Sequence, residues 1–310
     1  MATDTERVPK QPIHPSVIAR LDPEYLEFHN KHLLYLTPPH TLPWDPSIRS
    51  GPAVPGSSEP LKVGKTEDFD LPHTKFRAFT PEGPPPVNGW PVFIFFHGGA
   101  KCVVITVDYR LAPEHPYPTA VEDAIDSLHW VINNGKEKLS VNLQQIAVGG
   151  SSSGGNLAAI LALKAIEMQP PIPIIFQLLI VPVTDNTASV EDSWAENALT
   201  PWLSPGRMMW FRHNYLPNKE DWTKWDASPL FAPEHLIKQL PRTWIAVNEL
   251  DILRDEGIQY GEKLKAAGAA VHIELYKGAP HPIMAMDGVL KIGKKLVSDA
   301  VDALKNAFDT

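Results

Sequence analysis

The stretch from Gly149 to Asn156 reads GGSSSGGN, and its residue types and spacing are those of a reactive turn. Within it, Gly150 to Gly154 matches G-x-S-x-G, the pattern of a sharp strand-to-helix turn that exposes a serine hydroxyl. An apolar run, QQIAV, precedes the turn, and a helical pattern, NLAAILALKAI, follows it. A Gly/Ser run without such context is more often a flexible loop. The flanking strand and helix therefore make Ser152 the predicted nucleophile.

A serine hydroxyl is a weak nucleophile at neutral pH and needs a base that is itself oriented by a carboxylate. For a serine on this kind of turn, the expected chain order is serine, then acid, then histidine. Asp251 lies on the loop after the apolar run TWIAV, where an acid could reach over a sheet. Of its acidic neighbours, Glu249 is expected to point from the strand end, and Asp255 with Glu256 to cap the next helix. We therefore predict that Asp251 is the acid.

One of the twelve histidines has the position that a base requires. His281 follows the last predicted strand, AVHIELYKG, and precedes the final predicted helix, which begins at about Val289. His272 alternates with apolar residues inside that strand, so we expect it to face solvent. The chain order then predicts His281 as the general base.

Acyl transfer also needs N–H donors for the negative charge that develops on the carbonyl oxygen. The sequence His97-Gly98-Gly99 follows the apolar run VFIFF, in the position where such donors lie in this kind of fold. We predict that the backbone N–H groups of Gly98, Gly99 and Ser153 form this oxyanion hole. The sequence has no Cys/His cluster with metal-ligand spacing and no phosphate-binding or dinucleotide fingerprint, so we predict neither a metal nor a cofactor.

The surrounding elements are those of an α/β protein. From about residue 90 onward, near-continuous apolar strands alternate with helical patterns, which predicts a mostly parallel sheet covered by helices on both faces. Residues 63–80 predict a hairpin that turns near Pro72-His73. Asp22-Pro23-Glu24 predicts a helix start, with aspartate as the N-cap and proline at the first helical position.

Residues 193–231 interrupt this alternation with a segment rich in Trp, Met and Pro, where a single crossover helix is expected. Two interpretations remain open: an ordinary packed insertion, or a lid that carries the aromatic wall of an apolar ligand pocket. Under the second interpretation, the residues predicted to line the pocket are Trp202, Leu203, Met208, Met209 and Phe211.

The apolar runs VFIFF and CVVITV are separated by only the five residues HGGAK, His97 to Lys101. We expect these runs to be parallel strands of one sheet, and a parallel crossover takes a dozen or more residues. We therefore hypothesise that the sequence lacks a segment between Ala100 and Lys101. The alternative is a true deletion, which would remove a crossover helix and disturb the oxyanion hole.

Composition narrows the class of protein. The formal net charge of −8 and the pI near 5.8 argue against a nucleic-acid partner or an anionic membrane surface. The single cysteine, Cys102, rules out an internal disulfide and fits a reducing compartment. Neither a secretory signal nor a membrane span is predicted, because the N-terminus has no apolar core and the most apolar window, residues 170–183, is broken by prolines. We predict a cytoplasmic protein.

The motifs HGG, YRLAPE (residues 109–114) followed by HPYPTAVEDA, GSSSGGN, the Asp251 loop and His281 occur in this order. The chain thereby resembles the hormone-sensitive-lipase-like α/β-hydrolases, the esterases and lipases of the HGGG type. The resemblance runs from about Pro12 to the final helix. It implies the α/β-hydrolase fold, with a twisted eight-stranded sheet whose second strand is antiparallel. It also implies a helical cap made of residues 1–60 and 191–231 over a catalytic domain of residues 61–190 and 232–310.

The resemblance implies hydrolysis of small-molecule carboxylic esters, often with short or medium acyl chains, and homodimers are common in the family. The sequence departs from the family at Ser151, Ser153 and Pro282, where relatives usually carry an acidic residue, alanine and glycine. An amidase, a lactonase or an acyltransferase would use the same residues. A non-catalytic ligand-binding relative is the alternative that a true deletion after Ala100 would favour.

Overall fold

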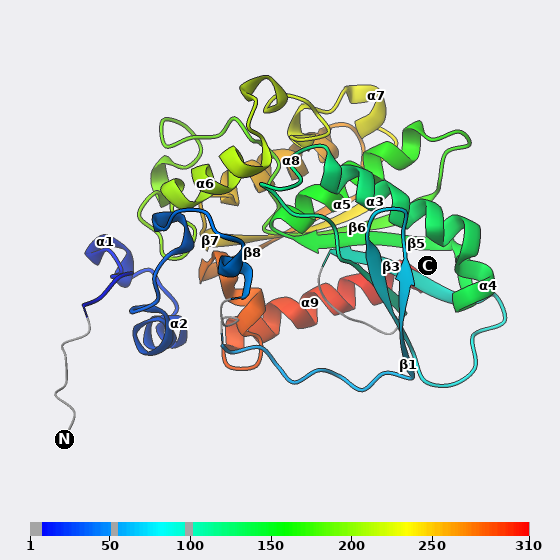
Figure 1. Cartoon of the computed structure of the whole chain (residues 1–310), viewed down its shortest axis with the longest axis horizontal. Helices are drawn as coiled ribbons and strands as arrows, with labels where there is room; N and C mark the ends of the chain where they lie inside the picture. Colours follow the sequence, from blue (N-terminus) through cyan, green and yellow to red (C-terminus); the bar gives the residue numbers. More distant parts are fainter. Residues whose placement is uncertain (1–7, 51–54, 97–101, 310) are drawn as a thin grey trace.

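The computed structural model describes residues 8–50, 55–96 and 102–309. Its centre is an eight-stranded sheet in the order β1-β2-β4-β3-β5-β6-β7-β8 (Figure 1). β2 is antiparallel to both of its neighbours, and every other neighbouring pair is parallel. The predicted hairpin, eight-stranded sheet and antiparallel second strand are therefore confirmed. The strands are β1 Lys65–Asp70, β2 Lys75–Thr80, β3 Trp90–Phe96, β4 Val103–Val107, β5 Val141–Ser151, β6 Ile174–Ile180, β7 Arg242–Leu250 and β8 Val271–Pro280.

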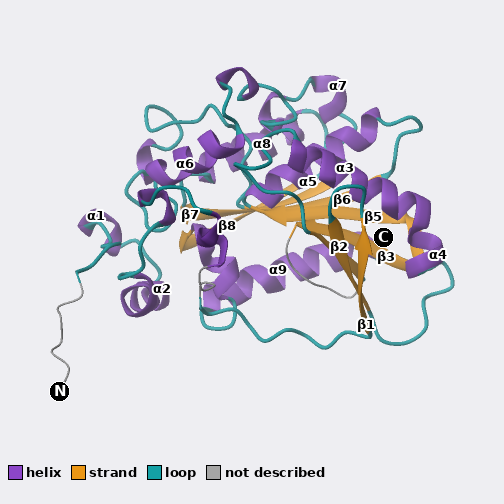
Figure 2. Ribbon diagram, in the orientation of Figure 1, coloured by secondary structure: helices purple, strands orange, loops and turns teal. Residues whose placement is uncertain are grey.

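Helices cover both faces of this sheet, as predicted (Figure 2). α3, α5 and α8 pack on one face, and α9 packs on the other. Within the described ranges, no helix is both long enough and apolar enough to cross a membrane. The α-helices are α1 Pro15–Ile18, α2 Pro23–Phe28, α3 Thr119–Trp130, α4 Lys136–Leu139, α5 Ser153–Glu167, α6 Pro205–Tyr215, α7 Glu234–Ile237, α8 Arg254–Ala266 and α9 Lys291–Phe308.

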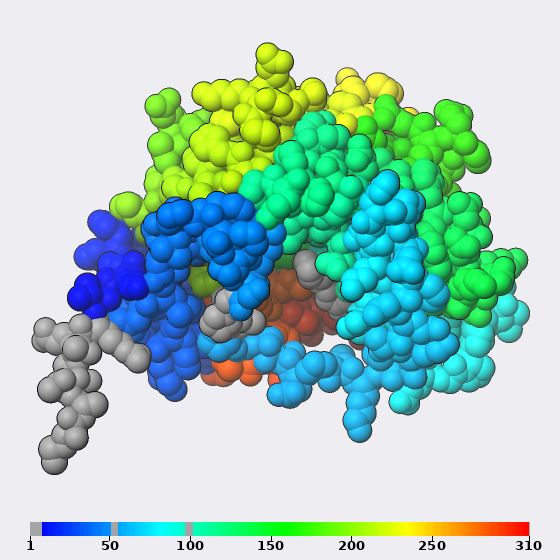
Figure 3. Space-filling view, in the orientation of Figure 1, coloured from blue at the N-terminus to red at the C-terminus, as the bar shows by residue number. Residues whose placement is uncertain are grey.

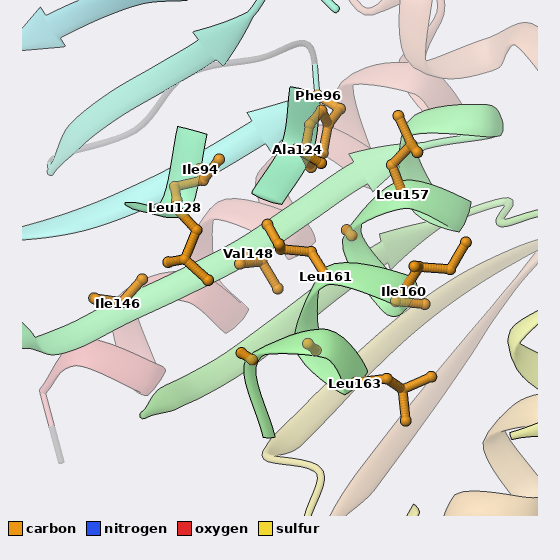
Figure 4. Close-up of a cluster of buried hydrophobic side chains, with 14 of the residues drawn as sticks. Ile94, Phe96, Ala124, Leu128, Ile146, Val148, Leu157, Ile160, Leu161 and Leu163 are labelled. Carbon is orange, nitrogen blue, oxygen red and sulfur yellow. The ribbon is translucent and has the colours of Figure 1, made fainter. Parts of the chain in front are cut away.

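The central strands are buried on both faces because their side chains alternate between two apolar layers. Ile94 and Phe96 of β3 join the layer of α3 and α5, where Ile94 lies near Leu128 and Phe96 near Ala124 (Figure 4). Phe93 and Phe95 of the same strand join the layer of α9. Burial of each such large apolar side chain contributes about 1.5–3 kcal/mol. The two layers therefore hold the strands, and the loops at their ends, in fixed positions.

β3 and β4 are parallel neighbours, with Val92 opposite Val103 and Phe95 opposite Thr106. The expected arrangement of these two strands is thus confirmed. Their connection has to return from the carboxyl end of β3 to the amino end of β4, which is why a crossover is expected there. The junction between Ala100 and Lys101 lies outside the described residues, so a missing segment at that position stays a prediction.

The N-terminal segment packs against the carboxyl ends of β7 and β8. α2 begins as predicted, with the Asp22 carboxylate accepting a hydrogen bond from the Tyr25 N–H at 3.0 Å and Pro23 at the first helical position. Apolar residues of α2 and of the chain on either side of it form a cluster with residues from the C-terminal part of the chain. The members of this N-terminal cluster are Val17, Leu21, Tyr25, Phe28, Leu33, Leu250, Met286 and Leu290.

The segment of residues 191–231, called the insertion below, also lies at the carboxyl end of the sheet. Leu203 and Met208, which flank the start of α6, pack against Ile252 and Leu253 on the loop that leaves β7. The N-terminal segment, drawn in blue, abuts the yellow-green atoms of the insertion on the surface (Figure 3). Two segments far apart in the sequence therefore cover the same end of the sheet.

At the turn from β5 into α5, the backbone approaches itself too closely for side chains. A Cβ atom on Gly150 would lie 2.2 Å from the carbonyl oxygen of Gly154. A Cβ atom on Gly154 would lie 2.7 Å from the carbonyl oxygen of Phe96 on the neighbouring strand. These contacts explain why the turn requires glycine on both sides of its central serine.

The substitution Gly150→Ala should therefore lower the free energy of unfolding by about 1–3 kcal/mol, because backbone has to move to accept the methyl group. Urea denaturation followed by circular dichroism would measure the change. Gly206→Ala is the control: its Cβ would meet no atom within 4 Å, and alanine favours a helix such as α6. A Gly150→Ala protein as stable as the Gly206→Ala protein would contradict this account of the turn.

Candidate active site

Ser152 is held in a strained conformation between β5 and α5. Its φ of 57° and ψ of −117° are unusual for a residue other than glycine. Its N–H donates to the carbonyl oxygen of Ile180 at 2.8 Å, and its own carbonyl oxygen accepts from the N–H of Asn156 at 3.1 Å. Such strain persists only where the surroundings fix it, and it is frequent at functional sites. The turn presents the hydroxyl group at the N-terminus of α5.

The three residues predicted to act together form one hydrogen-bonded chain. The Oγ atom of Ser152 lies 3.0 Å from Nε2 of His281, and Nδ1 of His281 lies 2.6 Å from Oδ2 of Asp251. An ionised carboxylate can only accept, so Nδ1 carries the hydrogen and Nε2 is left to accept from the serine hydroxyl. The Asp251 side chain is fully buried, and that of His281 is 10% exposed. The arrangement can remove a proton from Ser152.

Asp251 is fixed by contacts that the sequence did not reveal. Its Oδ1 atom accepts from the Leu253 N–H at 3.1 Å. The side-chain amide of Asn197, in the insertion, donates to the carbonyl oxygens of Glu249 at 3.0 Å and Asp251 at 2.9 Å. The insertion therefore holds the backbone of the loop that carries Asp251.

The segment that carries His281, where β8 passes into a short 3-10 helix, is anchored by β7. The side-chain amide of Asn248 donates to the carbonyl oxygens of Pro280 at 2.8 Å and His281 at 3.3 Å. The next residue, Glu249, does not simply point from the strand end as predicted, since its carboxylate accepts from the Gly278 N–H at 2.7 Å. Consecutive residues of β7 thus fix the end of β8.

The predicted capping role of Asp255 and Glu256 is wrong. α8 begins at Arg254 with Leu253 as its N-cap, so both acids already lie inside the first helical turn. Asp255 pairs with the Nε atom of Arg254 at 2.7 Å. Glu256 is buried and accepts from the N–H groups of Thr184 at 2.8 Å, of Asp185 at 3.2 Å and of the Trp194 indole at 3.3 Å. It therefore ties α8 to the start of the insertion.

Of the predicted oxyanion donors, only one belongs to the described residues. Gly98 and Gly99 lie outside them. Ser153 is the first residue of α5, where a backbone N–H has no partner within the helix. Its hydroxyl contacts the phenol of Tyr109, whose pKa is raised by burial. The Ser153 N–H can thus point at an atom bound beside Ser152.

A cavity of about 500 Å³ extends from Ser152 and His281 between the N-terminal segment and the insertion. Four of the predicted pocket residues, Trp202, Leu203, Met208 and Phe211, line it. Most of the other wall residues come from the N-terminal segment, from the YRLAPE motif and from α6; they include Pro39, Trp44, Ile48, Tyr109, Leu111, Trp210 and Tyr215. Most of these side chains are apolar or aromatic, which suits an apolar ligand.

Met209 is not among the described residues that line this cavity, contrary to the prediction. It packs beside the cluster of Trp194 and Ile252, and its sulfur accepts from Nη1 of Arg212 at 3.5 Å. The reason is helical phase, because residue 209 of α6 is turned about 100° away from residue 208.

The YRLAPE motif is anchored beneath the cavity. The guanidinium of Arg110 pairs with the Asp123 carboxylate of α3 at 2.7 Å, and the Arg110 N–H donates to the same carboxylate at 2.8 Å. The Asp123 side chain is fully buried. No group of three or more His, Cys, Asp or Glu residues in the described ranges is arranged to hold a metal ion.

Comparisons with known proteins agree with this fold. Residues 93–285 match a family described as the alpha/beta hydrolase fold. The chain is 42% identical over 331 aligned residues to the AB hydrolase superfamily protein C1039.03 of Schizosaccharomyces pombe, covering 96% of this chain and 97% of that protein. It is 35% identical to Esterase LipI of Mycobacterium tuberculosis over 249 residues, covering 74% and 77%.

Solved structures give the same result. A thermostable esterase from Pseudomonas putida matches with a TM-score of 0.71 and 34% identity, over 79% of this chain and 82% of that one. An alpha/beta hydrolase from the metagenome of Lake Arreo, LAE6, matches with a TM-score of 0.81 and 27% identity, over 94% and 100%. The alignment to the S. pombe protein is longer than the 310 residues of this chain, so some residues of that relative have no counterpart here.

Glu256 generates a prediction for the dependence of stability on pH. Burial raises the pKa of its carboxyl group from the ordinary 4.5 to about 8, against the opposing effect of its N–H donors. Between these values the native state keeps a proton that the unfolded chain has released. Stability from this group should therefore fall as the pH rises from about 5 to 8, by at most about 1.4 kcal/mol per pH unit.

The variant Glu256→Gln cannot titrate, so its unfolding free energy should lack this decline. Urea denaturation of both proteins at pH 5, 6, 7 and 8 would test the expectation. Glu262→Gln, at an exposed position of the same helix, should keep the wild-type profile. Parallel profiles for wild type and Glu256→Gln would show that Glu256 is already ionised in the native state.

Proposed function

Because the chain belongs to the alpha/beta hydrolase fold family and is a carboxylesterase-like member of it, we propose that it cleaves carboxylic esters through an acyl-enzyme on Ser152. The observation that carries this proposal is the chain of hydrogen bonds from Ser152 through His281 to Asp251, at 3.0 and 2.6 Å. A serine, a histidine and a buried aspartate in this geometry are the parts that nucleophilic acyl transfer needs.

In the first step, Nε2 of His281 takes the proton of Ser152 while Oγ attacks the ester carbonyl carbon. The imidazolium then gives this proton to the leaving alkoxide, so that an alcohol departs and the acyl group stays on Oγ. In the second step, His281 deprotonates a water molecule that attacks the acyl-enzyme, and the proton returns to Ser152 as the acid leaves. Throughout, the Asp251 carboxylate stabilises the imidazolium and keeps its ring oriented.

The oxyanion of each tetrahedral intermediate is proposed to bind the N–H of Ser153 together with the predicted donors Gly98 and Gly99. The N-terminus of α5 adds a favourable field, because unpaired N–H groups there carry partial positive charge. Loss of one such donor costs on the order of 100- to 1000-fold in turnover.

We propose that residues 1–60 and 191–231 form the cap, because both segments contribute walls to the cavity above Ser152. A mostly apolar space of about 500 Å³ fits an ester with a short or medium acyl chain. An amidase, lactonase or acyltransferase would share this site, and substrate profiling distinguishes them. The cytoplasmic location and the homodimer stay predictions.

The substitution Ser152→Ala should abolish hydrolysis of a short p-nitrophenyl ester, because no other atom at this position can form the acyl-enzyme. Release of p-nitrophenol measured at 400 nm would test it, with Ser193→Ala at a partly exposed turn as the matched control. A Ser152→Ala protein as active as the control would refute the mechanism and favour a ligand-binding role for the cavity.

Asp251→Asn should lower kcat on the order of 10³- to 10⁴-fold, because an amide no longer stabilises the imidazolium and favours the wrong tautomer of His281. Asp255→Asn makes the same chemical change four residues away, where the carboxylate pairs only with Arg254 among the described contacts. It should stay within a few-fold of wild type. Equal losses in the two variants would remove Asp251 from the proposed role.

A further inference from the structure

The wall of the cavity carries positive charge. Four arginines line it, Arg49, Arg110, Arg207 and Arg212, and the described lining residues include neither aspartate nor glutamate. The chain as a whole has a formal net charge of −8, so the positive wall does not follow from the composition. A cation in a mostly apolar pocket loses hydration and is costly unless an anion compensates it.

Three of these arginines are engaged within the protein. Arg49 forms a forked pair with Glu114, and Arg110 pairs with Asp123. The guanidinium of Arg212 lies between the Trp194 and Trp222 rings, 4.8 and 5.0 Å from their centroids, and donates to the Ala188 carbonyl oxygen at 2.8 Å.

Arg207 differs from the other three in that its guanidinium makes a single hydrogen bond among the described residues. Its Nη1 atom donates to the Trp202 carbonyl oxygen at 3.2 Å, and its guanidinium lies 4.5 Å from the centroid of the Trp202 ring. Like Arg212, it has no carboxylate within 4 Å among the described residues, and the titratable groups that face it are Tyr25 and His40. Burial lowers the pKa of Arg207 to about 10, so it still carries its charge at neutral pH.

The platform under Arg207 is rigid. Trp202 has a φ of 73°, a conformation that costs a residue other than glycine about 1–3 kcal/mol and persists only under constraint. Its side chain packs against both the N-terminal cluster and the cluster of Leu203 and Met208. Trp202 therefore contacts one edge and one face of the guanidinium. The other guanidinium N–H groups of Arg207, which lines the cavity, have no hydrogen-bond partner among the described residues.

We propose that Arg207 binds a carboxylate of the substrate, so that the preferred substrates are esters that carry a second, free carboxylate, such as monoesters of dicarboxylic acids. Arg207 and Ser152 line the same cavity, which lets one molecule present its carboxylate to the first and its ester to the second. The planar fork of N–H donors matches a carboxylate in two parallel hydrogen bonds. This inference rests on the proposed ester hydrolysis and names its substrate class.

The test compares monoethyl adipate with ethyl 6-methylheptanoate, in which a neutral isopropyl group replaces the carboxylate. Acid release in a pH-stat gives kcat/KM for each, and the anionic-to-neutral ratio is the readout. Arg207→Gln should lower this ratio about tenfold to hundredfold, the range expected for a hydrogen-bonded ion pair. Arg207→Lys should restore part of the ratio, because it keeps the charge without the fork.

Arg77→Gln is the matched control, since Arg77 lies on β2 in an exposed pair with Asp68 and the substitution changes the net charge equally. It should leave the ratio as in wild type. If Arg207→Gln lowers kcat/KM equally for both esters, Arg207 supports the structure of α6 and the inference is overturned. Ester hydrolysis by wild type would in that case still stand.

A binding measurement separates this inference from the proposed mechanism. Calorimetry with the Ser152→Ala protein should detect binding of monoethyl adipate. The additional change Arg207→Gln should weaken that binding about tenfold to hundredfold, as expected for the ratio of kcat/KM values. If wild type hydrolyses neither ester, ester hydrolysis fails as the function, and this binding difference still decides the role of Arg207. Equal affinities in the two proteins would overturn it.

Discussion

The close approach of backbone to backbone between β5 and α5 is the constraint on which the site depends. A Cβ atom on Gly150 would clash with Gly154 and one on Gly154 would clash with Phe96 of β3, and Ser152 between the two glycines takes a φ of 57°. The strain is held by β5, which lies between β3 and β6, and by α5, which is buried along most of its length. A relaxed turn would move the hydroxyl away from His281. The apolar layers on both faces of the sheet thus keep one serine in an unfavourable conformation.

Around this turn, the residues that react and the residues that surround the ligand belong to different parts of the chain. Asp251 and His281 lie on loops at the ends of neighbouring parallel strands, and the amides of Asn197 and Asn248 fix the backbone of those loops. Much of the cavity wall comes from the N-terminal segment, the YRLAPE motif and α6. Arg207 belongs to this second group, and among the described residues its guanidinium donates a hydrogen bond only to Trp202.

The sequence predicted the features that depend on local pattern or chain order. Ser152 sits in a motif with a recognisable strand before it and helix after it, and Asp251 and His281 follow at the expected loops. Asn197, Asn248, Glu256 and the environment of Arg207 depend on contacts between distant segments, which residue types do not specify. Met209 was wrongly predicted to line the pocket, because a segment rich in Trp and Met indicates an apolar helix but not which of its faces meets the cavity. The prediction that Asp255 and Glu256 cap α8 failed because the helix begins at Arg254, slightly earlier than the sequence pattern indicated.

The packing of the N-terminal segment has a consequence for how the protein is made. Tyr25 and Phe28 are buried against Met286 and Leu290, and Ser58 binds Asp287, so their partners lie in the last part of the chain. A ribosome adds about 5–20 residues per second, which leaves the early segment without these partners for roughly 10 to 50 s. During synthesis its apolar face is therefore open to chaperones and to neighbouring nascent chains. The cavity can form only after the ribosome has added His281, the last of its described lining residues.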